Sequence, residues 1–441
     1  MRPWRIWYMG KFAYFWFRRD LRETDNHGLY AALQSGVAVR PVFIFDRDIL
    51  DKLANKSDAR MSYLYEELQS LKSRFQAYGS DLEIHYGRAT EVWQQLLKEQ
   101  PQAVYVNEDY EPYALKRDAA IQSQCEALGI PMHFFKDQVI FAKNEVVKDD
   151  GKPYTVFTPY MKKWKIALTA NPIQFYPSEA HLNQLESCDL KTAPTLAEMG
   201  FNSNPVLFPP KEINQGRIKN YEAQRDIPSI AGTSRLSLHF RFGTISIREK
   251  FQKGYSLSEK WINELIWREF YMQILWHFPH VTQGSFKPKY DQIQWRNNEA
   301  EFEKWKAGKT GYPMVDAGMR ELNTTGFMHN RVRMVVASFL TKHLLIDWRW
   351  GESYFAEKLL DFELASNNGG WQWAAGSGVD AAPYFRVFNP QSQLEKFDPD
   401  FKYVRTWVPE FGTPLYPAPM VDHKMARERC LSSYKEALSG L

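Results

Sequence analysis

The hydrophobic pattern of this 441-residue chain changes near residue 140, and that change constrains the fold more than any other feature. Before it, short segments rich in β-branched and aromatic residues alternate with segments in which apolar residues recur every three or four positions. Strands that alternate with helices form a parallel, doubly wound sheet, so we expect a Rossmann-like α/β domain. The expected strands are 12–17, 37–45, 82–86, 103–107 and 132–135.

The second half of the chain has an all-α pattern. Strand signals largely vanish after residue 210, and helical periodicity predicts helices at 245–253, 258–276, 299–306, 314–323, 329–345, 351–363 and 422–437. Prolines interrupt the segment between the halves, which predicts a long connector with one or two short helices. We therefore expect an α/β domain at 1–139, a connector at 140–205 and an all-helical domain at 206–441.

The composition excludes several classes of protein. Charged residues make up 24% and hydrophobic residues 44%, as in globular domains. Three widely spaced cysteines (Cys125, Cys188 and Cys430) do not form a disulfide framework, and no apolar run approaches the roughly 18 residues of a membrane helix. We expect a cytoplasmic protein without a membrane partner or a signal peptide. His277 and His280 lack a third ligand nearby in the sequence, so no metal site is expected.

Tryptophan is concentrated in the second half, where ten of the 15 lie after residue 200. A buried indole N–H needs a hydrogen-bond partner, so this concentration points to stacking or redox roles beside ordinary core packing. Residues 201–441 also carry a small excess of basic side chains, which is compatible with a polyanionic partner.

Two helical segments combine polar, basic and bulky residues on one face. A carboxylate, an aromatic plate and a guanidinium three and four positions apart suit a stacked nucleobase flanked by a phosphate. Part of the pattern at 261–271 is also that of an amphipathic core helix. The two sets are Glu264, Trp267 and Arg268 within 261–271, and Asn330, Arg331 and Met334 within 326–334.

Two glycine-containing segments are predicted to form turns that contact a ligand. In 361–375, adjacent Asn and Gly residues break a helix and allow close backbone approach, and Asn367 can both donate and accept hydrogen bonds. Trp371 and Trp373 flank this loop, which disfavours an ordinary tight turn. The hydroxyls and backbone N–H groups of 232–237 form a natural phosphate cradle, although the same residues also suit a helix N-cap.

These motifs resemble the flavin domain of the photolyase/cryptochrome family. The matching segments are 232–237, 261–271, 310–319, 325–334 and 361–390, and they are most similar to class I cyclobutane pyrimidine dimer photolyases. Residues 15–22 resemble the family's first strand and turn, so the resemblance spans about 12–437. It implies light-driven repair of pyrimidine dimers in UV-damaged DNA, in which excited reduced FAD passes an electron to the dimer, the ring splits and the electron returns.

The resemblance also implies three groups of functional residues. FAD would be held by Tyr221, Thr233, Ser234, Arg235, Leu236, Ser237, Trp261, Asn330, Arg333, Asp361, Phe362, Glu363 and Asn367, with Asn367 facing the flavin N5 and the Arg333–Asp361 pair beside the ring. The flipped dimer and its DNA would contact Arg225, Glu264, Trp267, Arg268, Asn330, Arg331, Met334, Trp373 and Arg386. Electrons would reach the flavin through Trp295, Trp348 and Trp371, which form the catalytic set together with Glu264 and Asn367.

The chain departs from the family pattern at a few positions. Glu363 replaces the usual Asp, and Phe327 replaces the usual Trp; both lie next to expected FAD contacts. The folate-binding pattern has Asn-Glu at the positions of Tyr113 and Ala114 and Cys-Lys near residues 282–283, and neither pair is present. Folate is therefore not expected as an antenna chromophore, while a deazaflavin, another flavin or no antenna remain open.

The main alternative is a cryptochrome-like blue-light photoreceptor without repair. Asn367, Glu264, Trp267 and Met334 favour repair, as does the lack of a long tail, and the expected electron chain disfavours a helical protein that only stores flavin or binds DNA. His-Asn-Arg at 329–331 stands where (6-4) photolyases carry a histidine pair, which disfavours that lesion. We expect a monomer. The segment before residue 12 matches nothing in the family, which leaves Met1 and Met9 as alternative starts.

Overall fold

The computed structural model describes residues 12–204 and 206–439, so the alternative start at Met9 lies outside the described residues. The described chain forms two compact units, each made of several segments. The first contains 12–140, 173–204, 206–211 and 239–250, and the second contains 141–172, 212–238 and 251–439. The segment 140–205, expected as a connector, is thus divided between the two units.

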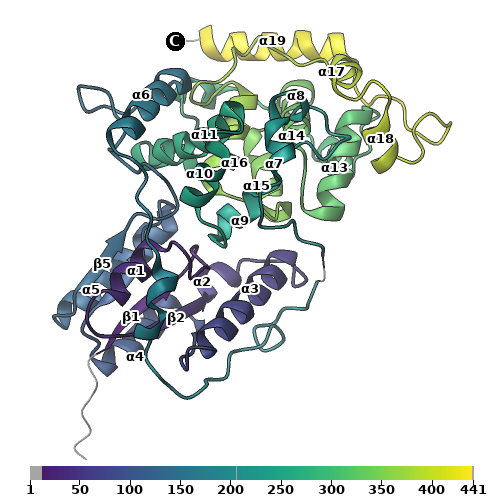
Figure 1. The fold of residues 1–441 in the computed structure, drawn as a ribbon. Helices are drawn as coiled ribbons and strands as arrows, with labels where there is room; N and C mark the ends of the chain where they lie inside the picture. Colours follow the sequence, from purple (N-terminus) through teal and green to yellow (C-terminus); the bar gives the residue numbers. More distant parts are fainter. Residues whose placement is uncertain (1–11, 205, 440–441) are drawn as a thin grey trace, which may run out of the picture. The chain divides into compact units, whose positions relative to one another are not determined.

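The first unit is built on a five-stranded parallel sheet in the order β3-β2-β1-β4-β5, as the alternating pattern predicts (Figure 1). Each expected strand is present, with bounds that differ by at most one residue. The strands are β1 (Phe12–Phe17), β2 (Ala38–Asp46), β3 (Glu83–Gly87), β4 (Val104–Asn107) and β5 (Met132–Phe135). The order of the strands reverses between β1 and β4, which makes a topological switch point at their carboxyl ends.

Residues of β1 alternate between two buried layers, because successive side chains of a strand point to opposite faces. Phe15 and Phe17 belong to one hydrophobic cluster, and Tyr14 and Trp16 belong to the other. Helices therefore cover both faces of the sheet. The helical elements of this unit are α1 (His27–Leu33), α2 (Arg47–Leu50), α3 (Ala59–Gln76), α4 (Ala89–Leu96), η1 (Leu97–Glu99), α5 (Pro112–Ala127) and η2 (Ser178–Gln184).

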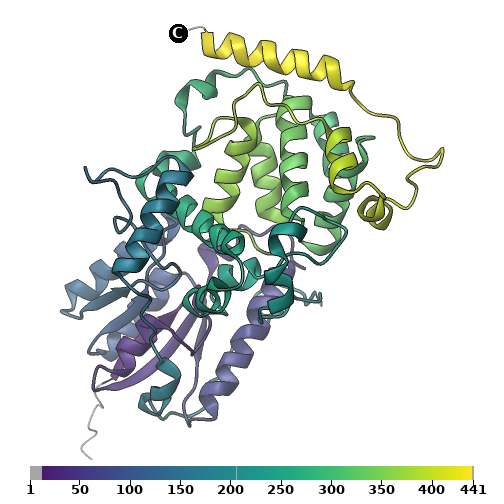
Figure 2. The same ribbon diagram turned by 45° about the horizontal axis from the view of Figure 1, so that its top comes forward.

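The second unit is helical, as expected. The green helices in Figure 2 run side by side, and their buried faces form one hydrophobic cluster that includes Trp305, Trp348 and Trp371. Its helices are α6 (Phe157–Ala170), α7 (Gln215–Lys219), α8 (Tyr221–Gln224), α11 (Glu259–His277), α12 (Glu299–Lys306), α13 (Pro313–Thr325), α14 (Asn330–Ser338), α15 (Trp348–Lys358), α16 (Leu364–Ala375), α17 (Pro390–Phe397), α18 (Lys402–Trp407) and α19 (His423–Ser439). Two further helices, α9 (Ser237–Phe242) and α10 (Ile247–Tyr255), contain residues of both units.

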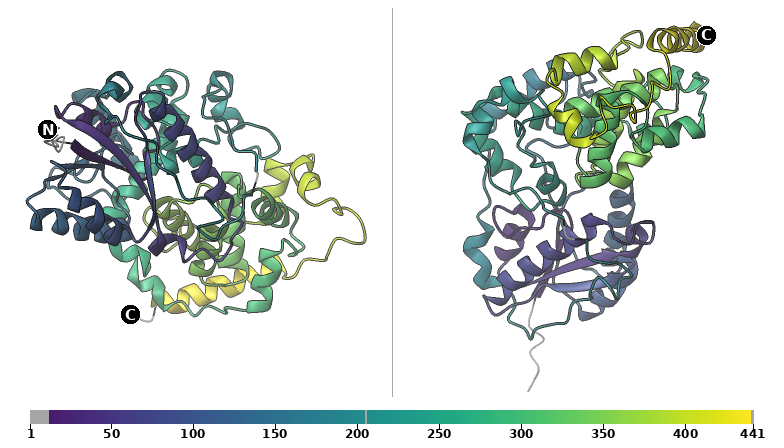
Figure 3. Two further views of the ribbon diagram at one scale, coloured as in Figure 1. Left: turned by 90° about the horizontal axis from the view of Figure 1, so that it is seen from below. Right: turned by 90° about the vertical axis from the view of Figure 1, so that its right-hand side faces the viewer.

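Short irregular helices complete the second unit. A π-helical segment at Phe339–His343 follows α14, where a continuous helix to residue 345 was expected. The last helix α19, yellow in Figure 3, packs on this segment and on the 3-10 turn η4 (Pro288–Gln292). The 3-10 turn η3 (Pro279–Thr282) follows α11. No helix among residues 12–204 and 206–439 has the length and apolar character needed to cross a bilayer.

The prediction of a helix-breaking loop between Asn367 and Trp373 is wrong, because these residues form the middle of α16. Close packing explains why glycines are compatible with this helix. A Cβ on Gly369 would lie 2.2 Å from Cδ1 of Tyr271, so the glycine lets α11 approach closely. The helix ends at Gly376, which has a φ of 87° in the left-handed region that favours glycine.

Candidate functional site

The predicted phosphate cradle at 232–237 lies next to the start of α11. The indole Nε1 of Trp261 donates to Oγ of Ser234 at 3.3 Å, and Nη1 of Arg217 donates to the carbonyl oxygen of Thr233 at 3.2 Å. A Cβ on Gly232 would lie 2.7 Å from the backbone oxygen of Gln224, so only glycine fits there without a shift. The loop therefore holds the hydroxyl of Ser234 beside the buried Trp261.

An ion pair joins α14 to the segment that precedes α16. Nη2 of Arg333 donates to both carboxylate oxygens of Asp361, at 3.1 and 3.0 Å, and its Nε donates to the carbonyl oxygen of Met328 at 2.7 Å. Oγ of Ser237 donates to the same carboxylate at 2.6 Å. The structure thus brings the cradle and the Arg333–Asp361 pair together, both of which were assigned to one ligand.

Asn367 lies on α16 with its side-chain amide fixed by α15. Its Nδ2 donates to the backbone oxygen of Glu352 at 3.1 Å and to Oε1 of Glu352 at 2.9 Å. A backbone oxygen only accepts, so the amide nitrogen must point toward Glu352, and Oδ1 is the group that is left to bond a ligand. Burial raises the pKa of Glu352, and the hydrogen bond from Asn367 opposes that shift.

The remaining residues assigned to FAD differ in burial and in their contacts. Glu363 is the N-cap residue of α16, and Oγ of Ser366 donates to its Oε2 at 3.3 Å. Phe362 packs against the hydrophobic cluster of the second unit. Tyr221 and Leu236 are buried, whereas Arg235 is exposed with its guanidinium 4.3 Å from the ring centroid of Phe327.

The residues expected at the lesion form a charged group near the start of α11. Nη1 of Arg225 donates to Oε1 of Glu264, and Nη2 of Arg331 donates to Oδ1 of Asp226 at 2.9 Å. Nη1 of Arg331 also lies 3.8 Å from the sulfur of Met334. Burial raises the pKa of the Glu264 carboxyl, and the adjacent Arg225 guanidinium opposes that shift.

The aromatic residues expected to hold the lesion are half-buried. Trp267 stacks face to face on Phe157 of α6, with ring centroids 3.7 Å apart and an interplanar angle of 6°. Trp373 packs against the main helical cluster and lies 6.4 Å from Phe388. One indole face of Trp267 is therefore occupied by Phe157.

The residues expected to contact DNA differ in exposure. Arg386 is exposed on the loop between α16 and α17, Asn330 is exposed at the first position of α14, and Arg268 is half-buried on α11. His329 precedes Asn330, and its Nδ1 accepts the backbone N–H of Arg331 at 3.2 Å. This contact caps the start of α14, and burial lowers the pKa of His329 to about 4.

The three tryptophans of the expected electron chain lie in one region. Trp371 and Trp348 are each 2% exposed in the same cluster, and Trp295 packs on its edge and is half-exposed. Trp371 also contacts Trp305 edge to face, with ring centroids 6.2 Å apart. Burial thus decreases from Trp371 to Trp295, as a path from the interior to solvent requires.

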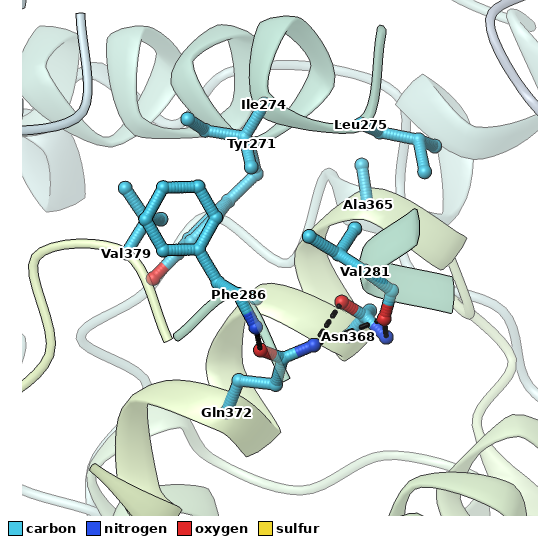
Figure 4. Close-up of a pocket in the computed structure, with 10 residues that line it drawn as sticks. Tyr271, Ile274, Leu275, Val281, Phe286, Ala365, Asn368, Gln372 and Val379 are labelled. Atoms are coloured by element: carbon cyan, nitrogen blue, oxygen red, sulfur yellow. Dashed lines mark hydrogen bonds between the residues drawn. The ribbon is translucent and has the colours of Figure 1, made fainter. Parts of the chain in front are cut away.

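A small pocket on another face of α16 lies between α11 and η3 (Figure 4). Its amides are bonded to the backbone: Oε1 of Gln372 accepts the N–H of Phe286 at 2.7 Å, and Nδ2 of Asn368 donates to the carbonyl oxygen of Val281 at 3.0 Å. The side chains that line it are otherwise mostly apolar. This pocket is therefore part of the support of α16, separate from Asn367.

A second pocket in the first unit lies at the carboxyl ends of β1 and β4. It is lined by Arg18, Arg19, Asp20, Asn107, Glu108, Asp109, Asp137 and Gln138. Nη1 of Arg18 pairs with Asp118, while its Nη2 is buried and has no hydrogen-bond partner among the described residues. The pocket coincides with the topological switch point, where doubly wound sheets bind ligands.

Comparisons with known proteins assign this architecture to a family. Residues 13–178 match the family model described as DNA photolyase, and residues 261–414 match the one described as FAD binding domain of DNA photolyase. The chain belongs to the photolyase/cryptochrome family. The deoxyribodipyrimidine photo-lyases of Synechococcus and Halobacterium salinarum are each 37% identical to it; the alignments cover 96% of this chain and 96% and 98% of those enzymes.

Solved structures of the family have the same fold. A class III photolyase from Agrobacterium tumefaciens has a TM-score of 0.86 and 34% identity, covering 97% of this chain and 98% of that one. An archaeal photolyase from Sulfolobus tokodaii, solved with two FAD molecules, has a TM-score of 0.83 and 35% identity, covering 96% and 100%. A Synechocystis cryptochrome has a TM-score of 0.84 and 26% identity, covering 96% and 99%. The assignment to class I stays a prediction, and one similar solved structure is that of a class III photolyase.

Three residues of the candidate site were missed from the sequence: Glu352, Trp305 and Asp226. Glu352 fixes Asn367 from 15 residues away, and Trp305 reaches Trp371 from another helix. Asp226 directly follows Arg225 in the sequence. An acidic neighbour of an expected phosphate-binding arginine was a signal that the sequence did contain.

Proposed function

We propose that this protein repairs cyclobutane pyrimidine dimers in DNA with light absorbed by bound FAD. The observation that carries the proposal is α16, which holds the expected flavin-facing Asn367, the expected electron donor Trp371 and the expected lesion wall Trp373 on one helix. Fixing these three side chains on a rigid element supports the precise placement that electron transfer between ligand and lesion needs. The names of the relatives support the same activity.

The residues of the second unit fit FAD. The Thr233–Ser237 loop offers hydroxyls and backbone groups for phosphates, the Arg333–Asp361 pair offers charge beside a ring, and Asn367 offers an oriented Oδ1 acceptor. When bound, reduced FAD supplies the light absorption and the transferable electron. The protein positions the ring, tunes its charge and keeps the lesion within reach.

The charged group around Glu264 fits a flipped pyrimidine dimer. Trp267 and Trp373 provide apolar walls, and Glu264 and Asn330 provide hydrogen bonds to the pyrimidine edges. The raised pKa of Glu264 is consistent with this role, because a carboxyl held in a desolvated position forms strong hydrogen bonds with a bound base. Arg225, Arg268, Arg331 and Arg386 provide contacts for the DNA backbone.

A light-collecting second ligand is supported at the switch point of the first unit. The pocket there contains the buried Nη2 of Arg18, which has no hydrogen-bond partner among residues 12–204 and 206–439, and the Sulfolobus tokodaii relative was solved with two FAD molecules. We expect a second chromophore when the protein is purified from its natural host. Denaturing the purified protein and quantifying the released chromophores tests this; one FAD per chain and nothing else would contradict it.

We further infer that the protein acts as a monomer in the cytoplasm. All three cysteines are free thiols, and Cys125 and Cys430 are buried, which suits a reducing compartment. Light scattering of the purified protein tests the monomer, and a dimer mass would overturn it.

The experiment that tests the proposed function is illumination of an oligonucleotide that contains a single cyclobutane dimer, in the presence of the reduced holoprotein. Light-dependent restoration of the two pyrimidines is expected, with none in the dark. A cryptochrome-like receptor would bind FAD and photoreduce it without removing any dimer.

A further inference from the structure

Two arginines that are expected to bind the DNA backbone each donate to a carboxylate in the protein without DNA. Arg225 donates to Glu264, and Arg331 donates to Oδ1 of Asp226 at 2.9 Å. The same Oδ1 of Asp226 lies 3.7 Å from Nε of Arg225. Asp226 therefore lies between the two guanidinium groups, and all four charged side chains form one cluster.

The cluster is electrically balanced, because it contains two guanidinium groups and two carboxylates. A DNA phosphate must take the place of a carboxylate before it can pair with either arginine. The side chain of Asp226 is 39% exposed, whereas those of Arg331 and Arg225 are 16% and 17% exposed. A partly exposed ion pair is weak enough to exchange for a phosphate, so Asp226 competes with DNA instead of blocking it.

Two contacts hold the Arg331 side chain in place. The guanidinium of Arg331 lies 4.3 Å from the ring centroid of Phe397, and its Nη1 lies 3.8 Å from the sulfur of Met334. These contacts hold the stem and the plane of the guanidinium, so the exchange of Asp226 for a phosphate requires little movement of Arg331.

We propose that Asp226 is a specificity-determining residue, which keeps Arg331 from binding phosphates until a lesion has engaged Glu264. The inference rests on the proposed function, since it takes Glu264 as the residue that bonds the flipped dimer. When Glu264 turns to the pyrimidine edge, Arg225 loses its partner, and Asp226 at 3.7 Å is an alternative carboxylate for it. Arg225 then draws the Asp226 carboxylate away from Arg331, and Arg331 pairs with a phosphate in its place. Undamaged DNA does not engage Glu264. Arg331 therefore stays paired with Asp226 and is not released to a phosphate.

The test compares binding of undamaged duplex with binding of the same duplex carrying one cyclobutane dimer, measured in the dark by fluorescence anisotropy. Asp226→Asn keeps the shape of the side chain and removes its charge. We expect its affinity for undamaged DNA to rise roughly fivefold and its affinity for the dimer duplex to rise less than twofold. The salt dependence of undamaged binding should steepen by about one phosphate contact.

Asp400→Asn is the matched control, because Asp400 is an exposed acid that pairs with Lys402 outside the cluster. It changes the net charge equally and should leave the ratio of the two affinities unchanged. In an Arg331→Ala background, Asp226→Asn should no longer raise the affinity for undamaged DNA. A purely structural Asp226 would not produce this dependence on Arg331.

Three results would overturn the inference: an unchanged affinity ratio in Asp226→Asn, an equal effect of Asp400→Asn, or an effect that persists without Arg331. Asp226→Ser removes the same charge and is expected to have the same effect on the two affinities. If one variant misfolds, the other still tests the inference. The proposed function fails separately, if the wild-type protein shows neither a preference for the dimer duplex nor light-dependent repair.

Discussion

The amide nitrogen of Asn367 donates to both the backbone oxygen and Oε1 of Glu352, at 3.1 and 2.9 Å. This double contact fixes which end of the amide is available to a ligand. With the nitrogen held by Glu352, the oxygen of Asn367 is an acceptor, and an acceptor at a flavin N5 favours the form of the ring that carries a hydrogen there. With Asn367 at the flavin N5, as proposed, Glu352 would bias the bound flavin toward its reduced form.

Replacing Glu352 with Ala should lower the reduction potential of the bound flavin. The free energy involved is about 1 kcal/mol, the net contribution of one hydrogen bond. Glu352→Gln retains an amide oxygen at the same position and should stay close to wild type. A spectroscopic titration of the holoprotein measures both variants. Glu352→Ala removes the Oε1 contact and keeps the backbone oxygen of residue 352, so equal potentials in wild type and Glu352→Ala would show that the Oε1 contact does not affect the flavin.

Trp371→Phe should slow photoreduction of the oxidised flavin by at least an order of magnitude while leaving FAD content unchanged. The indole at 371 is buried in the same cluster as Trp348, and a phenyl ring is much harder to oxidise. Trp305→Phe is the control, because Trp305 contacts Trp371 at 6.2 Å but lies outside the expected chain. Normal photoreduction without Trp371 would contradict the chain assignment.

Glu264→Ala should lower the number of dimers repaired per absorbed photon more than it lowers dimer binding. The carboxyl is expected to bond the pyrimidine edge, so its loss acts on the electron-accepting lesion, while Arg331 and the other arginines still hold the DNA. Repair yield and dark binding are measured on the same oligonucleotide. A yield equal to that of wild type would remove Glu264 from the catalytic set.

Two adjacent glycines of α16 should respond oppositely to alanine. A Cβ on Gly369 would lie 2.2 Å from Tyr271, whereas a Cβ on Gly370 meets no atom within 4 Å. Gly369→Ala should lower the free energy of unfolding by about 1–3 kcal/mol through overpacking. Gly370→Ala should raise it by about 0.5–1 kcal/mol, because alanine is the better helix former. Denaturant unfolding distinguishes the two, and a stable Gly369→Ala would mean that α11 and α16 are not in close contact.

The stability of the second unit should decrease in mild acid because of His343. Its Nε2 lies 2.8 Å from Nδ1 of His423, and burial lowers its pKa from 6.5 to about 3. The folded state therefore binds fewer protons than the unfolded state below pH 6.5, so stability is complete above that pH and is lost as pH falls toward 3. Between pH 7.5 and 5.5, wild type should lose about 1 kcal/mol more than His343→Gln. Parallel pH profiles would contradict this origin.

The strands were predictable because each is a short segment with β-branched or aromatic residues between helical patterns, so local sequence indicates both its position and its type. The prediction of a loop at 367–373 was wrong because contacts with distant parts of the chain determine the structure of this segment. Asn368 bonds Val281 across 87 residues, and Gly369 packs on Tyr271 from another helix, so tertiary contacts outweigh the low helix propensity of the segment.

The partners of the charged residues also lay beyond local sequence. The helical spacing correctly grouped Glu264 with Trp267 on α11, but Arg225 is 39 positions from Glu264, and Glu352 is 15 positions from Asn367. Residue type indicated which side chains are chemically useful. Only the folded chain shows which of them restrain one another.

Light-dependent repair by the reduced holoprotein, measured on matched oligonucleotides with a cyclobutane dimer or a (6-4) lesion, tests the central claim most directly. The account predicts that the cyclobutane dimer is converted to two intact pyrimidines in the light, that the dark sample is unchanged, and that the (6-4) lesion persists. An intact cyclobutane dimer after illumination, from protein that carries reduced FAD and binds the lesion, would contradict the account.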